Sequence, residues 1–253
     1  MKSSSKLKRK IKSFALSNLQ FVAIIVLPLI IGIFRPNFLT LMNLNNVMDL
    51  SSILIISALG FSFVVETGSI DLSIEANMAL SGVVMAKILQ SNPNLGILSI
   101  GAAILVAALC GFLNGLIHTK LKIPSFLTTL GMSYIASGVC TVITQGQYIT
   151  YENIKMRDIV IGRLGGIKGV IPNTIIIMLI VAAVIWILSE KKAFGRHVLA
   201  VGGDELISKD LGINIDCVKI LSFTIAGATF GLAGALLALN LGAGDSFSAI
   251  GYT

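Results

Sequence analysis

Long stretches without a charged residue constrain this 253-residue chain more than any other feature. Of five or six uncharged apolar runs, the clearest are Ser13–Phe34, Ile123–Tyr151, Gly169–Ser189 and Ile220–Gly244, each free of Asp, Glu, Lys and Arg. A helix rises about 1.5 Å per residue, so about 20 apolar residues cross the roughly 30 Å hydrocarbon core of a bilayer. The runs therefore predict an all-α integral membrane protein, a polytopic bundle of transmembrane helices.

The composition supports this class and excludes others. Hydrophobic residues make up 55% of the chain and charged residues 12%, about half the share in soluble domains. The net charge is +7, but the basic residues lie between the apolar runs without interleaved aromatic residues, so we exclude nucleic acid. The three cysteines show no paired spacing, and His118 and His197 have no ligand-spaced partner, so we expect no metal site.

The apolar pattern predicts about seven spans, with ends uncertain by about four residues. We place them at Leu19–Phe34, Leu50–Glu66, Leu72–Leu89, Leu95–His118, Ile123–Gln145, Val170–Leu188 and Lys219–Leu241. Residues 13–253 then form a single transmembrane domain behind a basic tail, 1–12, and the long polar loop 190–218 separates the last two spans.

Basic residues predict the orientation. Most of the 19 Lys and Arg fall in the tail 1–12 and in the loops 118–122 and 189–218. Because basic residues collect on the cytoplasmic side of short loops, we expect the N-terminus and the loop 190–218 in the cytoplasm.

The junction Glu66–Ser73 is too short for an ordinary loop and carries two carboxylates. It is either a tight cytoplasmic turn between two spans or a broken helix that points into a pathway, since non-helical backbone at membrane depth must be buried in protein or line a cavity. Asp71 could cap the amides of the next helix. Glu66 and Glu75 have no such role, and carboxylates inside a membrane indicate function or a buried partner.

Glycines predict where helices approach closely. Gly111–Gly115 and Gly227–Gly231 fit the pattern GxxxG, which lets two backbones touch in lipid. Asn114 lies within the first of these patterns and either hydrogen-bonds to a neighbouring helix or lines a polar route.

The loop 190–218 contains the signature of a short helix. Asp204 is a good N-cap, Glu205 suits the positive helix start, and Gly212 is a natural stop. Leu206, Ile207 and Leu211 fall on one side of this helix, which is too short to be stable alone. The apolar side either folds back on the chain's own membrane helices or inserts into a groove on a cytoplasmic partner.

Four motifs in order resemble a known family. They are Ala193-Phe-Gly-Arg-His-Val-Leu-Ala-Val-Gly-Gly-Asp-Glu205 with Ser208-Lys-Asp-Leu-Gly-Ile213, Gly68-Ser-Ile-Asp-Leu-Ser73, Gly111-Phe-Leu-Asn-Gly115 and Lys122-Ile-Pro-Ser-Phe-Leu-Thr-Thr-Leu-Gly131. From about residue 40 onward the chain resembles the inner-membrane permeases of ABC importers in the ribose, xylose and arabinose group, with branched-chain amino-acid permeases as more distant relatives.

The resemblance implies a bacterial inner-membrane complex. A second permease subunit (a homodimer), cytoplasmic ATPase subunits and an extracytoplasmic sugar-binding protein would be the partners, beside membrane lipid. The loop 190–218 would be the coupling loop to the ATPase. Its coupling residues would be Gly195, Arg196, Gly202, Gly203, Asp204, Glu205, Leu206, Ile207, Leu211 and Gly212.

The sequence has no G-x-x-x-x-G-K-[ST] phosphate loop, so we expect a transport subunit that is not an enzyme and holds no cofactor, with ATP used by a separate subunit. Neutral sugars bind through hydroxyl hydrogen bonds, and a passage that releases them should carry little charge. We therefore expect a translocation path at Asp71, Ser73, Asn114, Thr128 and Thr129. Thr128 and Thr129 could instead bond to their own helix.

Two features depart from the family pattern. Ile74 or Glu75 stands where the family has the last glycine of its D-L-S motif, and family members continue beyond a Gly-Tyr similar to Gly251-Tyr252, so we expect a C-terminal truncation. The favoured function is an ABC importer permease for a small sugar such as ribose. The alternatives are a permease for another solute such as branched-chain amino acids, an ion-coupled secondary transporter that uses Glu66, Asp71 or Glu75, and a polytopic membrane enzyme.

Overall fold

The computed structural model describes residues 19–151, 156–158, 162–163, 171–246 and 248–251. The expected basic tail, 1–12, lies outside these residues. The chain divides into two compact units, Met1–Val47 and Met48–Thr253.

The first unit contains an apolar helix and the start of the next. Helix α2 (Leu19–Phe34) includes Pro28, and a short 3-10 turn, η1 (Pro36–Leu39), follows it. A side chain on Gly32 would overlap Leu39, so η1 folds back against the end of α2. Helix α3 (Leu41–Glu66) begins in this unit and continues into the second.

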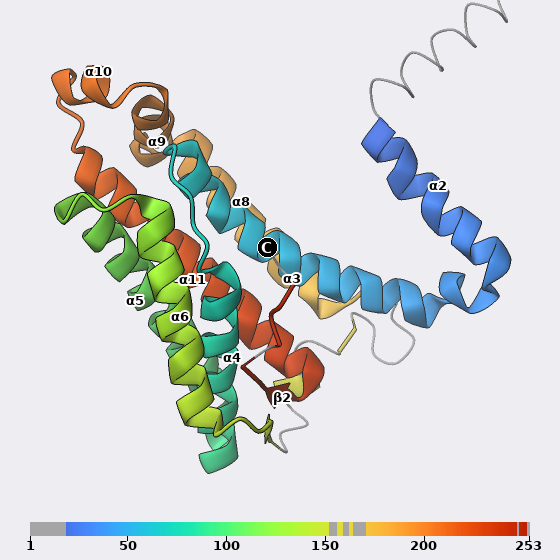
Figure 1. Cartoon of the computed structure of the whole chain (residues 1–253). Coiled ribbons are helices and arrows are strands. Elements are labelled where there is room, and N and C mark those ends of the chain that lie inside the picture. The colour runs from blue at the N-terminus through green and yellow to red at the C-terminus, as the bar shows by residue number, and fades with distance from the viewer. Residues whose placement is uncertain (1–18, 152–155, 159–161, 164–170, 247, 252–253) are drawn as a thin grey trace, which may run out of the picture. The chain divides into compact units, whose positions relative to one another are not determined.

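The second unit is a helical bundle with one small β-ladder (Figure 1). Its further helices are α4 (Ile74–Ser91), α5 (Gly96–Lys120), α6 (Ser125–Thr144), α8 (Asn173–Trp186), α9 (Ala193–Gly203), α10 (Glu205–Asp210) and α11 (Ile215–Leu241), with a 3-10 turn η2 (Pro93–Leu95) and a π-helical turn η4 (Ile187–Lys191). Strands β1 (Ile149–Thr150) and β2 (Ala243–Gly244) pair antiparallel beyond the ends of α6 and α11.

Helix α11 is the centre of this unit, and small residues bring its neighbours close. Side chains added at Gly111 of α5 or Gly227 of α11 would overlap a backbone carbonyl of the other helix. Gly234 meets the Met78 carbonyl of α4 in the same way. Both predicted GxxxG patterns are therefore sites of backbone contact, which is how helices associate where lipid supplies no hydrophobic drive.

Five helices of the described chain are long and apolar enough to cross a membrane: Leu41–Glu66, Pro93–Lys120, Ser125–Thr144, Asn173–Lys191 and Ile215–Leu241. The chain is thus an all-α polytopic membrane protein, as the apolar runs predicted. Most predicted span ends fall within four residues of the helix ends, but α3 begins nine residues before the expected Leu50.

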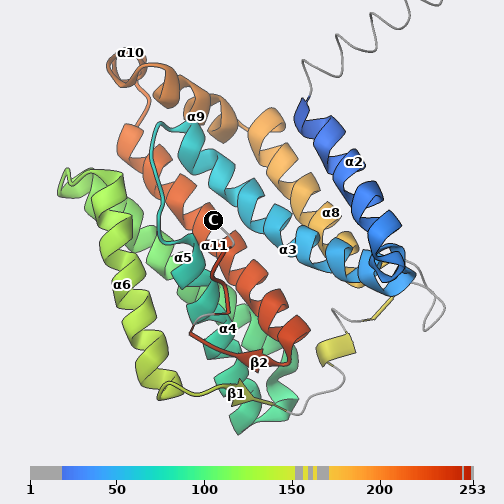
Figure 2. The same ribbon diagram turned by 45° about the vertical axis from the view of Figure 1, so that its right-hand side comes forward.

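Two of the seven predicted spans, those at α2 and α4, are not among the five described helices that are long and apolar enough to cross a membrane, so the count of seven is not confirmed. Figures 1 and 2 show the chain leaving the end of α3 beside α9, running back along the bundle without helical structure, and entering α4 partway along α6 and α11. Residues 67–73 therefore join α3 to α4 as a non-helical segment that runs along the bundle, which fits the broken-helix alternative better than a tight turn.

Candidate functional site

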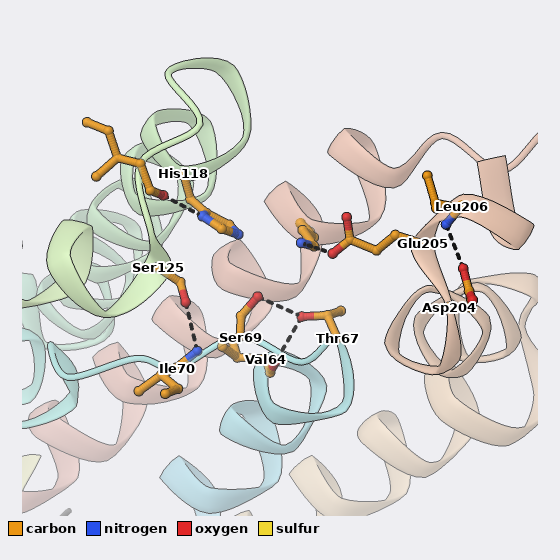
Figure 3. Close-up of polar contacts among 11 residues, drawn as sticks. Val64, Thr67, Ser69, Ile70, His118, Ser125, Asp204, Glu205 and Leu206 are labelled. Carbon is orange, nitrogen blue, oxygen red and sulfur yellow. Dashed lines mark hydrogen bonds and ion pairs between the residues drawn. The ribbon is translucent and has the colours of Figure 1, made fainter.

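Two backbone amides of the non-helical segment 67–73 donate hydrogen bonds to side chains of α6. The Ile70 amide donates to Ser125 Oγ at 3.0 Å (Figure 3), and the Leu72 amide donates to Thr129 Oγ1 at 3.0 Å. These bonds give partners to backbone amides that no helix pairs. The segment also alternates, with Ser69, Asp71 and Ser73 buried and Ile70 and Leu72 exposed. It therefore turns its polar face inward and its apolar face outward.

The side chain of Ser73 is the centre of a buried polar group that we call the Ser73 network: Asp71, Ser73, Asn77 and Asn114. Ser73 Oγ donates to Asp71 Oδ1 at 2.6 Å and accepts from Asn77 Nδ2 and Asn114 Nδ2, each at 3.0 Å. A hydroxyl has one donor and two acceptor positions, so this one is fully used. Three helices or segments, α4, α5 and 67–73, are joined at this atom.

Some oxygen atoms of the Ser73 network have no hydrogen-bond partner in the described part of the chain. Because both amides must present their NH₂ groups to Ser73, both carbonyl oxygens point away from it. Three oxygens of the network have no hydrogen-bond partner among the described residues: Asp71 Oδ2, Asn77 Oδ1 and Asn114 Oδ1. A buried acceptor without a donor lowers the stability of a protein, and it often marks strain or a binding place for water or a polar ligand.

The structure brings together most of the residues expected in the translocation path. Asp71, Ser73 and Asn114 belong to the Ser73 network, and Thr129 lies beside it, accepting the Leu72 amide while donating to Ser125 of its own helix at 2.9 Å. Thr128 is buried too, but its hydroxyl donates only to the Pro124 carbonyl. Asp71 caps no amide of α4; it accepts the Ser73 amide at 2.8 Å, and Ser73 is the N-cap residue.

Sequence reasoning missed Asn77 and Ser125. Asn77 follows Ser73 by four residues, the spacing at which two side chains meet on one helix face, and this signal could have found it. Ser125 gave no signal because its role is to satisfy the backbone of a segment 55 residues away.

The loop 190–218 is largely helical. The π-helical turn η4 ends α8, and α9 follows, with Val198 and Val201 buried against Phe63 of α3 and Val218 of α11. Phe194 adds an edge-to-face contact with Phe63 at 5.2 Å between ring centroids. Helix α9 is thus fixed to the bundle by its own small apolar core.

Helix α10 has the predicted ends. Asp204 Oδ1 accepts the amides of Leu206 at 2.8 Å (Figure 3) and Ile207 at 3.0 Å, so it is the N-cap. Gly212 has a φ of +80° and donates its amide to the Lys209 carbonyl at 2.9 Å, which ends the helix.

The apolar side of α10 does not fold back on the chain. Leu206, Ile207 and Leu211 are 77%, 59% and 73% exposed. The other side is attached: Glu205 accepts from Lys219 of α11 at 2.5 Å, and Lys219 is almost fully buried. Nearby, Lys120 at the end of α5 pairs with Asp216 of α11 at 2.6 Å. A short capped helix therefore presents three apolar side chains outward from a fixed base.

The two parts of the site meet at Gly202. A side chain at this position would overlap the carbonyl oxygen of Glu66, the last residue of α3, whereas one at Gly203 would meet nothing within 4 Å. Gly195 lies equally close to the Ser189 carbonyl. The loop 190–218 thus touches the chain at the point where the non-helical segment 67–73 begins. Arg196, the other expected coupling residue, is exposed on α9.

The described chain is thus a bundle of candidate membrane helices with a non-helical segment between α3 and α4 and an exposed loop helix, α10. The sequence model of the family described as "Branched-chain amino acid transport system / permease component" matches residues 43–252. The chain belongs to this family.

Individual relatives are import permeases. The chain is 30% identical to the ribose import permease protein of Escherichia coli (strain K12) over 245 residues, which are 95% of this chain and 75% of the relative. It is 33% identical to the ribose import permease protein of Bacillus subtilis (strain 168) over 87% of this chain and 68% of the relative. The L-arabinose transport system permease protein of Escherichia coli (strain K12) is 30% identical over 91% and 69%. No solved structure matches the chain.

Proposed function

We propose that this chain is the membrane-spanning subunit of an ATP-driven importer for a small sugar such as ribose. The family and the names of the ribose and arabinose permeases, at 30–33% identity over most of the chain, support this proposal. In this proposal the chain forms the passage and a separate ATPase subunit supplies the energy.

The observation that carries the proposal is the exposed apolar side of α10. A six-residue helix is unstable alone in water, and an exposed patch of three large apolar residues on a polar loop needs a partner. A helix lying in a hydrophobic groove is a common way for proteins to dock. The partner proposed here is the ATPase subunit.

The attachments of α9 and α10 support a mechanical role. The Glu205–Lys219 pair connects α10 to α11, and the Gly202 contact connects α9 to the end of α3. A push on α10 is therefore delivered to two membrane helices and to the start of the segment 67–73. Coupling between distant sites needs such a continuous chain of packed groups.

We further propose that the translocation path follows the segment held by the Ser73 network, with Thr128 and Thr129 beside it. Three acceptor oxygens without donors suit the hydroxyl groups of a neutral sugar. All of these side chains are buried in the described structure, so the path opens here only when the segment or α6 moves.

The complex proposed contains two copies of the permease, the ATPase subunits below and a sugar-binding protein above. In this arrangement the N-terminus and the loop 190–218 lie in the cytoplasm and the loop 146–169 faces outside.

The test uses a matched pair of variants of one residue. Leu206→Asp places a charge on the docking side, and Leu206→Met keeps it apolar. With the ATPase and binding protein co-expressed, we expect Leu206→Asp to abolish ATPase co-purification and ATP-dependent ribose uptake while the amount in the membrane is unchanged. Leu206→Met retains both. Full retention of both by Leu206→Asp removes the docking assignment.

A proton- or sodium-driven carrier is the rival class, because Asp71 is a carboxylate buried among membrane helices. The chain reconstituted alone separates the two. Uptake that needs only an ion gradient supports the carrier, and uptake that needs the ATPase and ATP supports the importer.

A further inference from the structure

The described chain has a pocket of about 700 Å³ that the transport mechanism above does not use. It lies between the end of α5, the connection 121–124, α10 and the start of α11. Figure 3 shows His118 of α5 and Glu205 of α10, which line it from two sides.

The pocket lies at the level of the membrane surface. Two of the membrane-spanning helices meet there: one ends at Lys120 and the other begins at Ile215. The ends of spans lie where phospholipid head groups are. This placement follows from the helix ends alone and does not depend on which side of the membrane faces the cytoplasm.

The charges of the pocket do not cancel. Its two carboxylates are already used, Glu205 by Lys219 and Asp216 by Lys120. Lys122 and Lys209 line the pocket as well, and neither has a carboxylate within ion-pair distance among the described residues. Two positive charges, one on the α5–α6 connection and one on α10, are left for an anion from outside the chain.

Further donors point the same way. Asn214 is the N-cap of α11: its Oδ1 accepts the Cys217 amide at 3.0 Å, which leaves its NH₂ group for a ligand. Helix α11 has 27 residues, and the positive end of its dipole lies at this wall. The N-terminus of a helix with nearby lysines is a familiar environment for phosphate.

The remaining wall is apolar. Ile123, Pro124, Ile213 and Ile215 line the pocket beside the charged residues. Inorganic phosphate would fill only a small part of the volume and would leave these side chains without a contact. A molecule with a phosphate and an apolar body matches both walls.

We propose that this pocket binds the head group of an anionic phospholipid, with the phosphate between Lys122 and Lys209 and the glycerol and upper acyl chains against the isoleucines. Basic pockets between membrane helices bind such head groups. Bound there, the lipid ties α10 to the α5–α6 connection and so stiffens the base on which the exposed side of α10 is mounted. The binding itself does not rest on the proposed function.

The probes are phosphatidylglycerol and phosphatidylcholine. The full chain is placed in phosphatidylcholine nanodiscs with increasing phosphatidylglycerol, and both the unfolding temperature and the phosphatidylglycerol retained after detergent exchange are measured. We expect the unfolding temperature to rise and saturate. In Lys122→Gln/Lys209→Gln the half-saturating fraction rises about thirtyfold, since each lysine contributes about 1 kcal/mol near an anionic surface and 1.4 kcal/mol is tenfold.

The matched control removes two lysines from the same end of the bundle but outside the pocket. Lys191→Gln/Lys192→Gln loses the same charge and should keep the retained lipid and the saturating rise, which separates a site from general attraction to a cation. An equal loss in both double variants overturns the proposal, as does the same unfolding temperature in both lipids. Saturation of the effect by glycerol 3-phosphate or inorganic phosphate in pure phosphatidylcholine assigns the pocket to a soluble phosphate compound and overturns the lipid source.

Discussion

Ser73 shows how much a single hydroxyl group can hold together. It is one residue of a broken helix, yet its oxygen bonds to a carboxyl group on its own segment and to amides on α4 and α5. Ser222 of α11 offers a comparison, because it is equally buried but bonds only to the Val218 carbonyl of its own helix.

We expect Ser73→Ala to lower the stability of the purified protein by about 2–4 kcal/mol, because two buried amide groups lose their partner together and Asp71 Oδ1 keeps only the backbone amide of residue 73. Ser222→Ala should cost about 1 kcal/mol or less. Thermal or denaturant unfolding in detergent measures both. An equal loss of stability in the two variants would mean that the hydrogen bonds of the Ser73 network contribute no more than those of an ordinary buried serine.

Gly202 and Gly203 are neighbours with opposite surroundings. Gly202→Ala forces the end of α9 away from the Glu66 carbonyl, whereas Gly203→Ala meets open space at a negative φ. We expect Gly202→Ala to reduce ATP-dependent transport at least tenfold and Gly203→Ala to change it less than twofold. The measurement is uptake into vesicles, normalised to the amount of permease in the membrane. Similar uptake by both variants would show that the Gly202 contact has no role in transport.

Tyr151, in the connection after α6, gives a test by pH. Its hydroxyl donates to the Ala238 carbonyl at 2.9 Å, and burial raises its pKa to about 12, an effect that Arg157 reduces. A raised folded-state pKa means that the neutral phenol stabilises the fold fully below about pH 10 and that this contribution is lost as the pH rises through 12.

The phenolate absorbance of the native protein minus that of Tyr151→Phe isolates this residue. We expect the difference signal to appear only near pH 12 and to accompany loosening of the C-terminal end of α11. A difference signal complete by pH 10 contradicts the buried bond.

Among the elements, α5 and α11 form the closest pair. We expect Gly111→Ala to destabilise the bundle by several kcal/mol, because the added carbon would overlap the Phe223 carbonyl and backbone cannot move aside cheaply. Gly101→Ala on the same helix meets nothing within 4 Å and removes a helix-breaking residue, so it should be neutral or slightly stabilising. The free energy of unfolding of the two purified variants is the measurement. A Gly111→Ala variant as stable as the unchanged protein would contradict the close contact between α5 and α11.

The same scale shows what sequence could and could not predict. Helix ends with a local signal were right: Asp204 and Gly212 bound α10 as expected, and the glycines of α5 and α11 pack as expected. The start of α3 was missed because Met42–Asp49 contains polar residues that lowered the apolar signal although the helix continues. The sequence also left two alternatives for the residues before α4. Hydropathy cannot decide between them, because it does not show whether the amides of a non-helical segment find hydrogen-bond acceptors on α6.

Long-range pairings were beyond the sequence altogether. Nothing near Ser125 points to Ile70, and nothing near Lys219 points to Glu205, since each partner becomes a neighbour only after the bundle forms. Asp71, Ser73 and Asn114 were predicted from the chemistry of their side chains. That they hydrogen-bond to one another became visible only in the structure.

For the whole molecule, the orientation in the membrane decides whether the loop 190–218 can meet an ATPase in the cytoplasm. Cys217, at the start of α11, is exposed, Cys140 is buried and Cys110 is half-buried. We expect a membrane-impermeant thiol reagent to leave Cys217 unmodified in intact cells and to modify it in inside-out vesicles. Cys217→Ser is the control for labelling elsewhere. Labelling in intact cells would place the loop 190–218 outside and end its proposed role in docking an ATPase.

The hydroxyls of Ser125 and Thr129 have one more consequence. Because two amides of the segment 67–73 find their acceptors on α6, sliding α6 by a single turn would break both hydrogen bonds. If the proposed path opens here, we therefore expect helix α6 and the segment 67–73 to move together. We expect the backbone to bend at the ends of this unit, at Gly68, which has a φ of +73°, and at Gln145, which has a φ of +53°.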